Sequence, residues 1–137
     1  MKLAKESRYA IEGLQVLARK RFGSTIQVRK IAATAVVPAN FIARIFQELN
    51  RANILASARG VVRGYALAHK SNALTLKEIF LAVEGGDVFD RCVFWTDRCA
   101  DSSPCPMHFQ WQRVRQNIPK VMEQTTLADL ARQKPHQ

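Results

Sequence analysis

The chain has 137 residues, of which 47% are hydrophobic and 23% are charged, which predicts one domain with a modest core. No apolar run approaches the roughly 18 residues of a membrane span, and residues 1–6 run into charge where a secretory signal would turn apolar. We therefore expect a cytoplasmic protein with no membrane partner. The net charge of +10 lies in residues 1–70, which hold 13 Lys or Arg against 3 Asp or Glu, and this favours a nucleic-acid partner.

The first half of the chain predicts a helix-turn-helix. Apolar residues recur at helical spacing over residues 7–21 and again over 28–35. After a three-residue turn, Pro38 opens a third helix that runs to about Asn50, because a proline at the first helical position loses no hydrogen bond. The apolar side chains of this helix share one face, and Asn40, Arg44 and Gln47 lie on the other. A short helix, a tight turn and a longer helix with a polar outer face are typical of DNA-binding proteins.

A basic hairpin follows the helix-turn-helix. Residues 54–57 and 65–67 have strand composition, and the turn between them carries Arg59 and Arg63 with Gly60 and Gly64. A hairpin in this position is a wing, although an ordinary hairpin with solvated arginines remains the alternative. We expect a mainly α fold with a small β-wing, in which residues 1–86 form a winged helix-turn-helix DNA-binding domain.

Side-chain chemistry divides the basic half into base readers and phosphate contacts. Asn40, Arg44 and Gln47 suit base edges in the major groove, and Arg59 suits the minor groove. Lysines and arginines elsewhere position the protein without specifying sequence. The predicted DNA-binding residues are Lys2, Lys5, Arg8, Arg29, Lys30, Pro38, Asn40, Arg44, Gln47, Arg59 and Arg63.

Three cysteines and a histidine gather in the second half, within residues 87–108. A T-x-x-E capping box at Thr75 opens a helix that ends near residues 85–86, and the cysteine-rich loop follows it. Its pattern is C-x6-C-x5-C-x2-H, formed by Cys92, Cys99, Cys105 and His108. Thiolates and imidazole suit iron–sulfur clusters and zinc, but zinc sites usually contain a tighter C-x2–4-C pair. A cluster site is the favoured interpretation, and a reversible thiol–disulfide switch is the alternative.

Residues 109–124 predict a long dimerisation helix. Trp111, Val114, Ile118 and Val121 are spaced three, four and three residues apart, as in a coiled-coil seam. Such a stripe is more often packed core, but a lone helix after a loop favours pairing with a second copy. Pro119 predicts a kink about one turn before it. Residues 125–137 predict a final helical turn and a tail.

The whole pattern resembles the iron–sulfur-responsive winged-helix repressors, the family of the regulators IscR and NsrR. Six short stretches carry the resemblance besides the cysteines: residues 1–3, 8–10, 30–32, 59–60, 64–67 and 126–130. It implies a non-enzymatic, homodimeric transcriptional repressor that binds a palindromic operator in double-stranded DNA. An iron–sulfur cluster would control that binding in response to iron, redox state or nitric oxide. A cluster-free repressor with a thiol–disulfide switch is the alternative function.

The resemblance also implies a ligand set and shows three departures. His108 matches the histidine that completes a [2Fe–2S] site in IscR-like members, and [2Fe–2S] is favoured over [4Fe–4S]. In NsrR-like members an acid on helix one of the other subunit is the fourth ligand; the matching position holds Arg8, with Glu12 as a possible substitute. The chain departs from the family at its C-x6-C spacing, at Arg63 in place of a wing glycine, and at Ala43 in place of a glutamate that selects sequence.

Overall fold

The computed structural model describes residues 4–58, 63–90 and 106–132. The elements in these ranges are α1 (Lys5–Ala18), α2 (Val28–Ala35), α3 (Ala39–Arg51), β1 (Leu55–Ala58), β2 (Gly64–Leu67), the 3-10 turn η1 (Ser71–Ala73), α4 (Leu76–Glu84), α5 (His108–Arg115), α6 (Ile118–Gln124) and α7 (Leu127–Ala131). None of the helices in these ranges combines the length and the apolar character that crossing a membrane requires.

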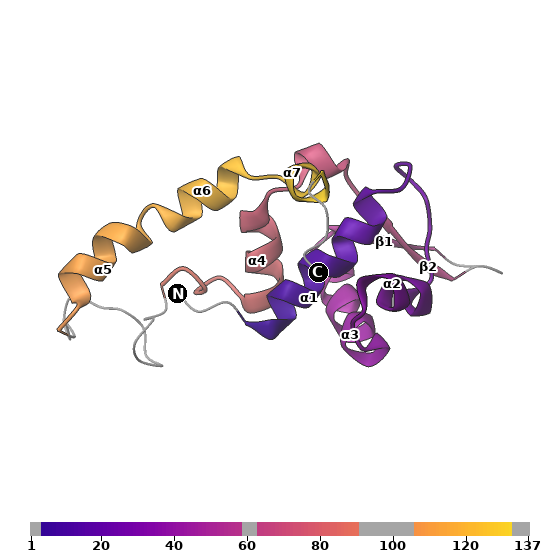
Figure 1. The fold of residues 1–137 in the computed structure, drawn as a ribbon, viewed down its shortest axis with the longest axis horizontal. Helices are drawn as coiled ribbons and strands as arrows, with labels where there is room; N and C mark the ends of the chain where they lie inside the picture. The colour runs from indigo at the N-terminus through magenta and orange to yellow at the C-terminus, as the bar shows by residue number, and fades with distance from the viewer. Residues whose placement is uncertain (1–3, 59–62, 91–105, 133–137) are drawn as a thin grey trace.

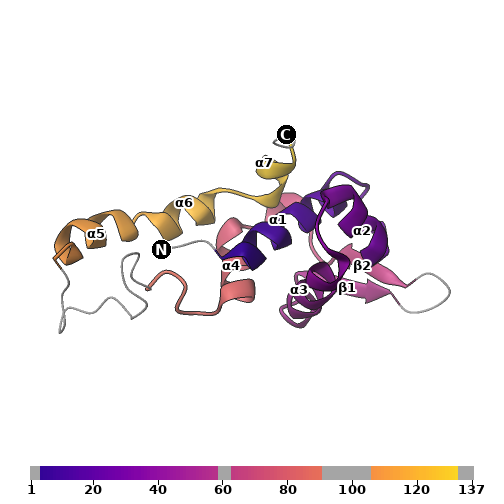
Figure 2. The same ribbon diagram turned by 60° about the horizontal axis from the view of Figure 1, so that its bottom comes forward.

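Helix α1 lies at the centre of the molecule (Figure 1). It packs against α2 and α3 on one side and against α4 and α7 on the other. The two strands lie at the end of the molecule that holds α2 and α3, whereas α5 and α6 extend away from this head as an arm (Figure 2). The molecule is therefore a compact head with one projecting arm.

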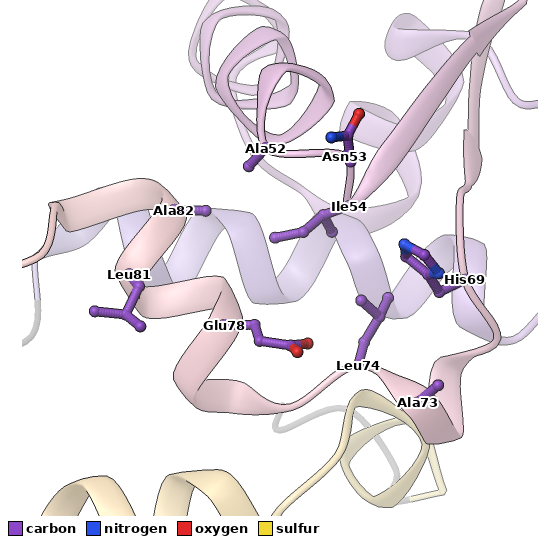
Figure 3. A pocket seen from close by; sticks show the side chains of 9 residues that line it. All are labelled: Ala52, Asn53, Ile54, His69, Ala73, Leu74, Glu78, Leu81 and Ala82. Carbon is purple, nitrogen blue, oxygen red and sulfur yellow. The ribbon is translucent and has the colours of Figure 1, made fainter.

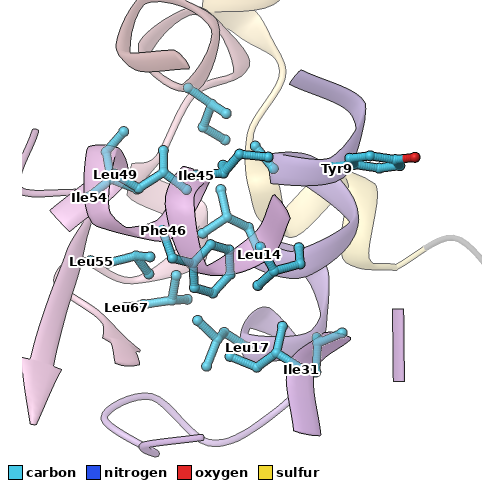
Figure 4. Close-up of a cluster of buried hydrophobic side chains, with 14 of the residues drawn as sticks. Tyr9, Leu14, Leu17, Ile31, Ile45, Phe46, Leu49, Ile54, Leu55 and Leu67 are labelled. Carbon is cyan, nitrogen blue, oxygen red and sulfur yellow. The ribbon is translucent and has the colours of Figure 1, made fainter. Parts of the chain in front are cut away.

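The core of the head forms where α1 meets α3. Ala10, Leu14, Ile42 and Phe46 are all fully buried there, and Figure 4 shows Leu14 beside the Phe46 ring. Within each helix the two residues are four positions apart, which places them on one helical face. Gly13 lets the two helices approach closely, because a Cβ at this position would lie 2.9 Å from the Phe46 ring and 3.2 Å from Ile42 Cδ1.

The predicted winged helix-turn-helix is confirmed. Helix α2 ends at Ala35, and its C-cap Val36 has a left-handed backbone (φ 57°, ψ 51°). Pro38 is the N-cap of α3, one position before the first helical residue that the sequence predicted it to be. Strands β1 and β2 pair antiparallel, with Leu55 opposite Leu67 at the inner end of the ribbon. The wing tip, residues 59–62, lies outside the described residues.

The ribbon is joined to the loop before α2 by a bridge between Ile26 and Tyr65. The backbone N–H of each residue donates to the other's carbonyl over 3.0 Å. Gly64 is required at this contact, because a Cβ there would lie 2.4 Å from the Ile26 carbonyl oxygen. This bridge fixes the strands of the wing relative to the start of α2.

Two capping boxes start α4 and α7. Thr75 and Glu78 form the predicted one, and Thr126 forms a second with Asp129. Hydrogen bonds from the Thr126 backbone N–H and from its side chain hold the pKa of Asp129 below its usual value. The two N-caps also pair as an isolated β-bridge, Thr75 to Thr126, so α7 starts beside α4. The last helical turn predicted from the sequence is therefore docked on the head.

The helix predicted over residues 109–124 is present as two shorter helices. Helix α5 ends at Arg115 and α6 begins at Ile118, with Gln116 and Asn117 between them. The break falls about one turn before Pro119, where the kink was predicted, because the proline ring lacks an N–H and clashes with the preceding turn. The C-terminal half of the arm packs on the head, since α6 contacts α4 and Lys77 Nζ lies 3.6 Å from Glu123 Oε2.

The added methyl of Gly13→Ala overpacks the fully buried Phe46 ring, at a cost of about 1–3 kcal/mol. Alanine recovers about 1 kcal/mol in a helix interior, so we expect a net destabilisation of up to about 2 kcal/mol. Gly86→Ala is the matched control, since no atom lies within 4 Å of its added Cβ. Chemical denaturation of the three proteins measures the effect. A Gly13→Ala variant as stable as the wild type would show that the helices do not meet at this contact.

Candidate nucleic-acid interface and cysteine segment

Helix α3 presents all three of its predicted base readers, Asn40, Arg44 and Gln47, to solvent. Asn40 and Gln47 are exposed, whereas Ile42, Ile45, Phe46 and Leu49 on the opposite face are buried in the head. The polar face lies free because the apolar face is used for packing. Pro38 and Ala39, at the start of α3, are also exposed.

Arg44, the third predicted base reader, is paired within the head. Its Nη2 lies 3.9 Å from Oε1 of Glu6 on α1, and its guanidinium carbon lies 5.6 Å from the centre of the Phe41 ring. The side chains of Arg44 and Glu6 remain 60% and 44% exposed, so water weakens the ion pair. Sequence reasoning did not identify Glu6, although it is one of only three acids in residues 1–70.

Three cations and two aromatic rings form a cluster where α1 begins beside α3. We call Lys5, Arg8, Tyr9, Phe41 and Arg44 the cation–aromatic cluster. The two rings lie 5.7 Å apart, Lys5 Nζ lies 5.5 and 5.7 Å from their centres, and Arg8 Cζ lies 5.4 Å from Tyr9. Cations over aromatic faces gain stability from the ring quadrupole. The cluster therefore holds predicted phosphate contacts in place, and the aromatic partners were not predicted.

The remaining cations of the predicted interface lie on α2 and the wing. Arg29 and Lys30 are exposed on the first turn of α2. Arg29 and Arg63 line one groove of about 320 Å³ between α2 and the ribbon. Lys30 lines a neighbouring cavity of about 420 Å³ with Lys20. Lys2 and Arg59 lie outside the described residues.

A different cavity, of about 490 Å³, lies between the end of α3, the start of β1 and α4 (Figure 3). Ile54 and Leu74 form part of its apolar lining, and His69 and Glu78 are polar groups at its edge. The residues predicted to bind DNA do not line this cavity.

The cysteine segment is described only at its two flanks, because Cys92, Cys99 and Cys105 lie outside the described residues. His108 begins α5 and is 1% exposed, with its ring 5.2 Å from that of Phe109. Among the described residues, no group of three or more His, Cys, Asp or Glu side chains is placed to hold a metal ion. The flanks contact each other, since Arg115 Nη1 donates to the Asp90 carbonyl over 3.3 Å.

The helices before and after this part of the chain, α4 and α7, are hydrogen-bonded to α1 and to its C-cap Arg19. On the N-terminal side, the hydroxyl of the fully buried Ser7 donates to the carboxylate of Glu84, the last residue of α4. On the C-terminal side, the side chains of Gln15 and Arg19 donate to the α7 carbonyls of Leu130 and Ala131. Leu127 of α7 is fully buried in the same core.

The four side chains of the predicted dimer seam lie along the arm and differ in their exposure to solvent. Val114 and Val121 are 53% and 60% exposed, whereas Trp111 and Ile118 are half-buried. Phe109, which was not predicted as part of the seam, is 68% exposed. The arm therefore presents several large apolar side chains to solvent.

Comparison with known proteins identifies a family. The family model described as Rrf2, an iron-dependent transcriptional regulator, matches residues 3–133. The chain is 27% identical over 131 residues to the transcriptional regulator CymR of Bacillus subtilis, covering 96% of this chain and 90% of that protein. The solved structure of CymR, the global cysteine regulator of B. subtilis, has a TM-score of 0.78 at 26% identity and covers 96% of both chains.

Regulators named IscR are also similar to this chain. The one from Vibrio atlanticus is 24% identical over 130 residues, which cover 95% of this chain and 75% of that protein. A solved structure of IscR from T. potens shares the fold, with a TM-score of 0.74 at 20% identity over 99% of this chain and 94% of that one.

Proposed function

This chain belongs to the Rrf2 family of iron-dependent transcriptional regulators, and from that premise we propose a cytoplasmic, homodimeric repressor whose operator binding is controlled by an iron–sulfur cluster. Family membership makes the chain a DNA-binding regulator and not an enzyme. One observation carries the finer proposal: α4, which precedes the cysteine segment, and α7, which follows the arm, are both hydrogen-bonded to α1, the helix that also packs against α3.

The DNA-binding half of the proposal rests on the outer faces of α2, α3 and the ribbon. Asn40 and Gln47 offer amide groups, which suit adenine edges in the major groove. Arg29, Lys30 and Arg63 surround α3 with exposed positive charge that suits phosphates. To contact a base, Arg44 must first break its ion pair with Glu6. The free-energy cost is small, because an exposed ion pair is worth about 0–1 kcal/mol.

The donor set fits an iron–sulfur cluster. Cys92, Cys99 and Cys105 supply three thiolates, and His108 supplies an imidazole at a buried position beside the segment. His108 lies three residues after Cys105 and is buried, which favours it over the alternative fourth ligand Glu12 and with it [2Fe–2S]. When bound, the cluster supplies a cross-link among its ligands that iron loss, oxidation or nitric oxide removes.

Contacts among the chain's own residues connect the segment to the DNA-binding face. Glu84 lies seven residues before the first undescribed position and accepts the hydrogen bond of Ser7. Glu6 precedes Ser7 on α1 and pairs with Arg44 on α3. A restraint on the segment therefore acts on the end of α4 and on the first turn of α1, the helix that packs against α3. By linkage, DNA binding acts on the segment to the same extent.

The exposed apolar side chains of the arm support a second copy of this chain as partner. Phe109, Val114 and Val121 are each more than half exposed. Pairing two arms removes them from water, at roughly 25 cal/mol per Å² of apolar surface before the loss of freedom on association is subtracted. A two-fold dimer presents two heads, which matches a palindromic operator.

Two substitutions on the DNA-binding face should behave differently. Gln47→Ala removes a base contact, so it should weaken binding to the preferred duplex by about 1–3 kcal/mol and relax the choice at one base pair. Lys30→Ala removes a phosphate contact, so it should weaken all sequences alike and lower the salt slope by about one unit. Salt titrations with a duplex selected from a random pool and with its scrambled form measure both effects. Lys70→Ala, an exposed lysine outside the predicted interface, controls for lost charge.

If the wild type binds the selected and scrambled duplexes equally at physiological salt, sequence-specific binding by this face is wrong. The basic half would then be a nonspecific anion-binding surface.

Protein purified without oxygen should show the visible absorption of an iron–sulfur cluster. Cys92→Ser, Cys99→Ser and Cys105→Ser should each abolish it, because the thiolates are the main ligands. His108→Ala should shift or destabilise it, and His69→Ala, an exposed histidine on the head, should leave it unchanged. Iron and sulfide assays accompany the spectra. If the wild type is colourless and its cysteines form a reversible disulfide, the cluster is wrong and the protein is a thiol–disulfide switch.

Val114→Asp combined with Val121→Asp should convert the dimer into a monomer at micromolar concentration, because it places like charges on both facing arms. Sedimentation velocity measures the change. Gln112→Asp combined with Gln116→Asp is the matched control, since it adds the same charge to the arm at residues outside the predicted seam. A double valine variant that stays dimeric excludes this face as the interface.

A further inference from the structure

Val36 has a backbone conformation that its side chain disfavours. It caps α2 in the left-handed region, at φ 57° and ψ 51°. A β-branched residue is a rare occupant of this region, where its Cβ crowds the following carbonyl. The other non-glycine residue with positive φ in the described part of the chain is Asn53, a residue type that tolerates it. The strain at Val36 is therefore not explained by residue preference.

The geometry of this helix end favours glycine at position 36. The backbone N–H groups of Val36 and Val37 both bond to the Ala32 carbonyl, closing the end of α2. Glycine is the usual residue at such a left-handed C-terminal position. Packing within the chain does not compensate, because Val37 is buried but the side chain of Val36 is 88% exposed. The isopropyl group thus gains little from the fold that strains it.

The place of Val36 in the chain indicates the kind of group that its exposed side chain contacts. It lies in the turn directly before α3, and the next exposed residues, Pro38 and Ala39, are also apolar. The first residues of a recognition helix meet base edges in the major groove. The apolar group that a base presents there is the 5-methyl of thymine. Strained backbone conformations cluster at functional sites, where contacts with a ligand use them.

We propose that Val36 is a specificity-determining residue that packs its isopropyl group against the 5-methyl group of a thymine in the operator. The inference rests on the proposed docking of α3 in the major groove. It assigns to the turn an apolar contact, beside the polar readers Asn40 and Gln47. Because this contact needs a methyl group and no hydrogen bond, uracil in place of that thymine removes it and leaves base pairing unchanged.

The test uses the full-length protein and the duplex that the wild type selects from a random pool. Each thymine of that duplex is replaced in turn by deoxyuridine, and the dissociation constant is measured for every duplex. With the wild type, one thymine in each half-site should give about three- to five-fold weaker binding on replacement, the equivalent of one buried methyl group. One buried methyl is worth about four-fold in affinity. Val36→Ala and Val36→Gly remove the isopropyl group that buries it, so with these variants the same replacement should change affinity less than about 1.5-fold.

Two controls separate the contact from folding and from general surface effects. Val36→Gly suits the left-handed backbone, so its thermal midpoint should not fall, and any loss of thymine preference is not a loss of structure. Phe22→Ala truncates a 52% exposed side chain in the loop between α1 and α2 and should keep the full uracil effect.

Each outcome decides the inference. A uracil effect that is present in the wild type and absent in both Val36 variants supports it. A selected duplex with no uracil effect, or with the same effect in wild type and variants, overturns it while leaving the proposed function intact. Failure of the wild type to select any duplex overturns this inference together with the proposed function.

Discussion

The close packing of α1 on α3 is the contact on which the rest of the molecule depends. Gly13 allows the Phe46 ring and Ile42 to lie against α1, and Ala10 and Leu14 complete the buried face. Because the inner face of α3 is used in this packing, its polar residues face solvent. The same contact sets where the cation–aromatic cluster lies, since two of its members are on α3 and three are on α1.

Helix α1 and its C-cap Arg19 also hold α4 and α7 through side-chain hydrogen bonds. Its first turn holds the end of α4 through Ser7 and Glu84, and Gln15 and Arg19 hold α7. The cysteine segment lies between these two attachments in the sequence. Under the proposed function, a change in the segment is transmitted to α3 through this one shared helix. This shared helix is a physical basis for coupling between a sensor and a DNA-binding face.

Local pattern predicted the elements of the fold well. The period of apolar residues predicted both bounds of α2, the T-x-x-E motif predicted the start of α4, and Pro119 predicted the break in the arm. Each of these features depends on residues within about two helical turns of one another. The left-handed turn at Val36 gave no signal, because the glycine that usually marks such a turn is absent.

The parts that escaped sequence reasoning depend on contacts between distant residues. Nothing near Arg44 in the sequence indicates that Glu6 pairs with it, and nothing near Leu127 indicates that α7 docks on α1. These contacts exist because the α1–α3 packing and the β-bridge between Thr75 and Thr126 bring the segments together. The residue types of the site could be predicted from the sequence, but the partners that hold them could not.

The central claim, that the cysteine segment and the DNA-binding face are coupled through α1, is tested most directly by one comparison of affinities. The dissociation constant for the selected duplex is measured for cluster-loaded protein and for the same protein after the cluster is removed, at one salt concentration and without oxygen. The account predicts that the two constants differ by at least about five-fold, which is a coupling free energy of about 1 kcal/mol. Equal constants for the two forms would contradict it.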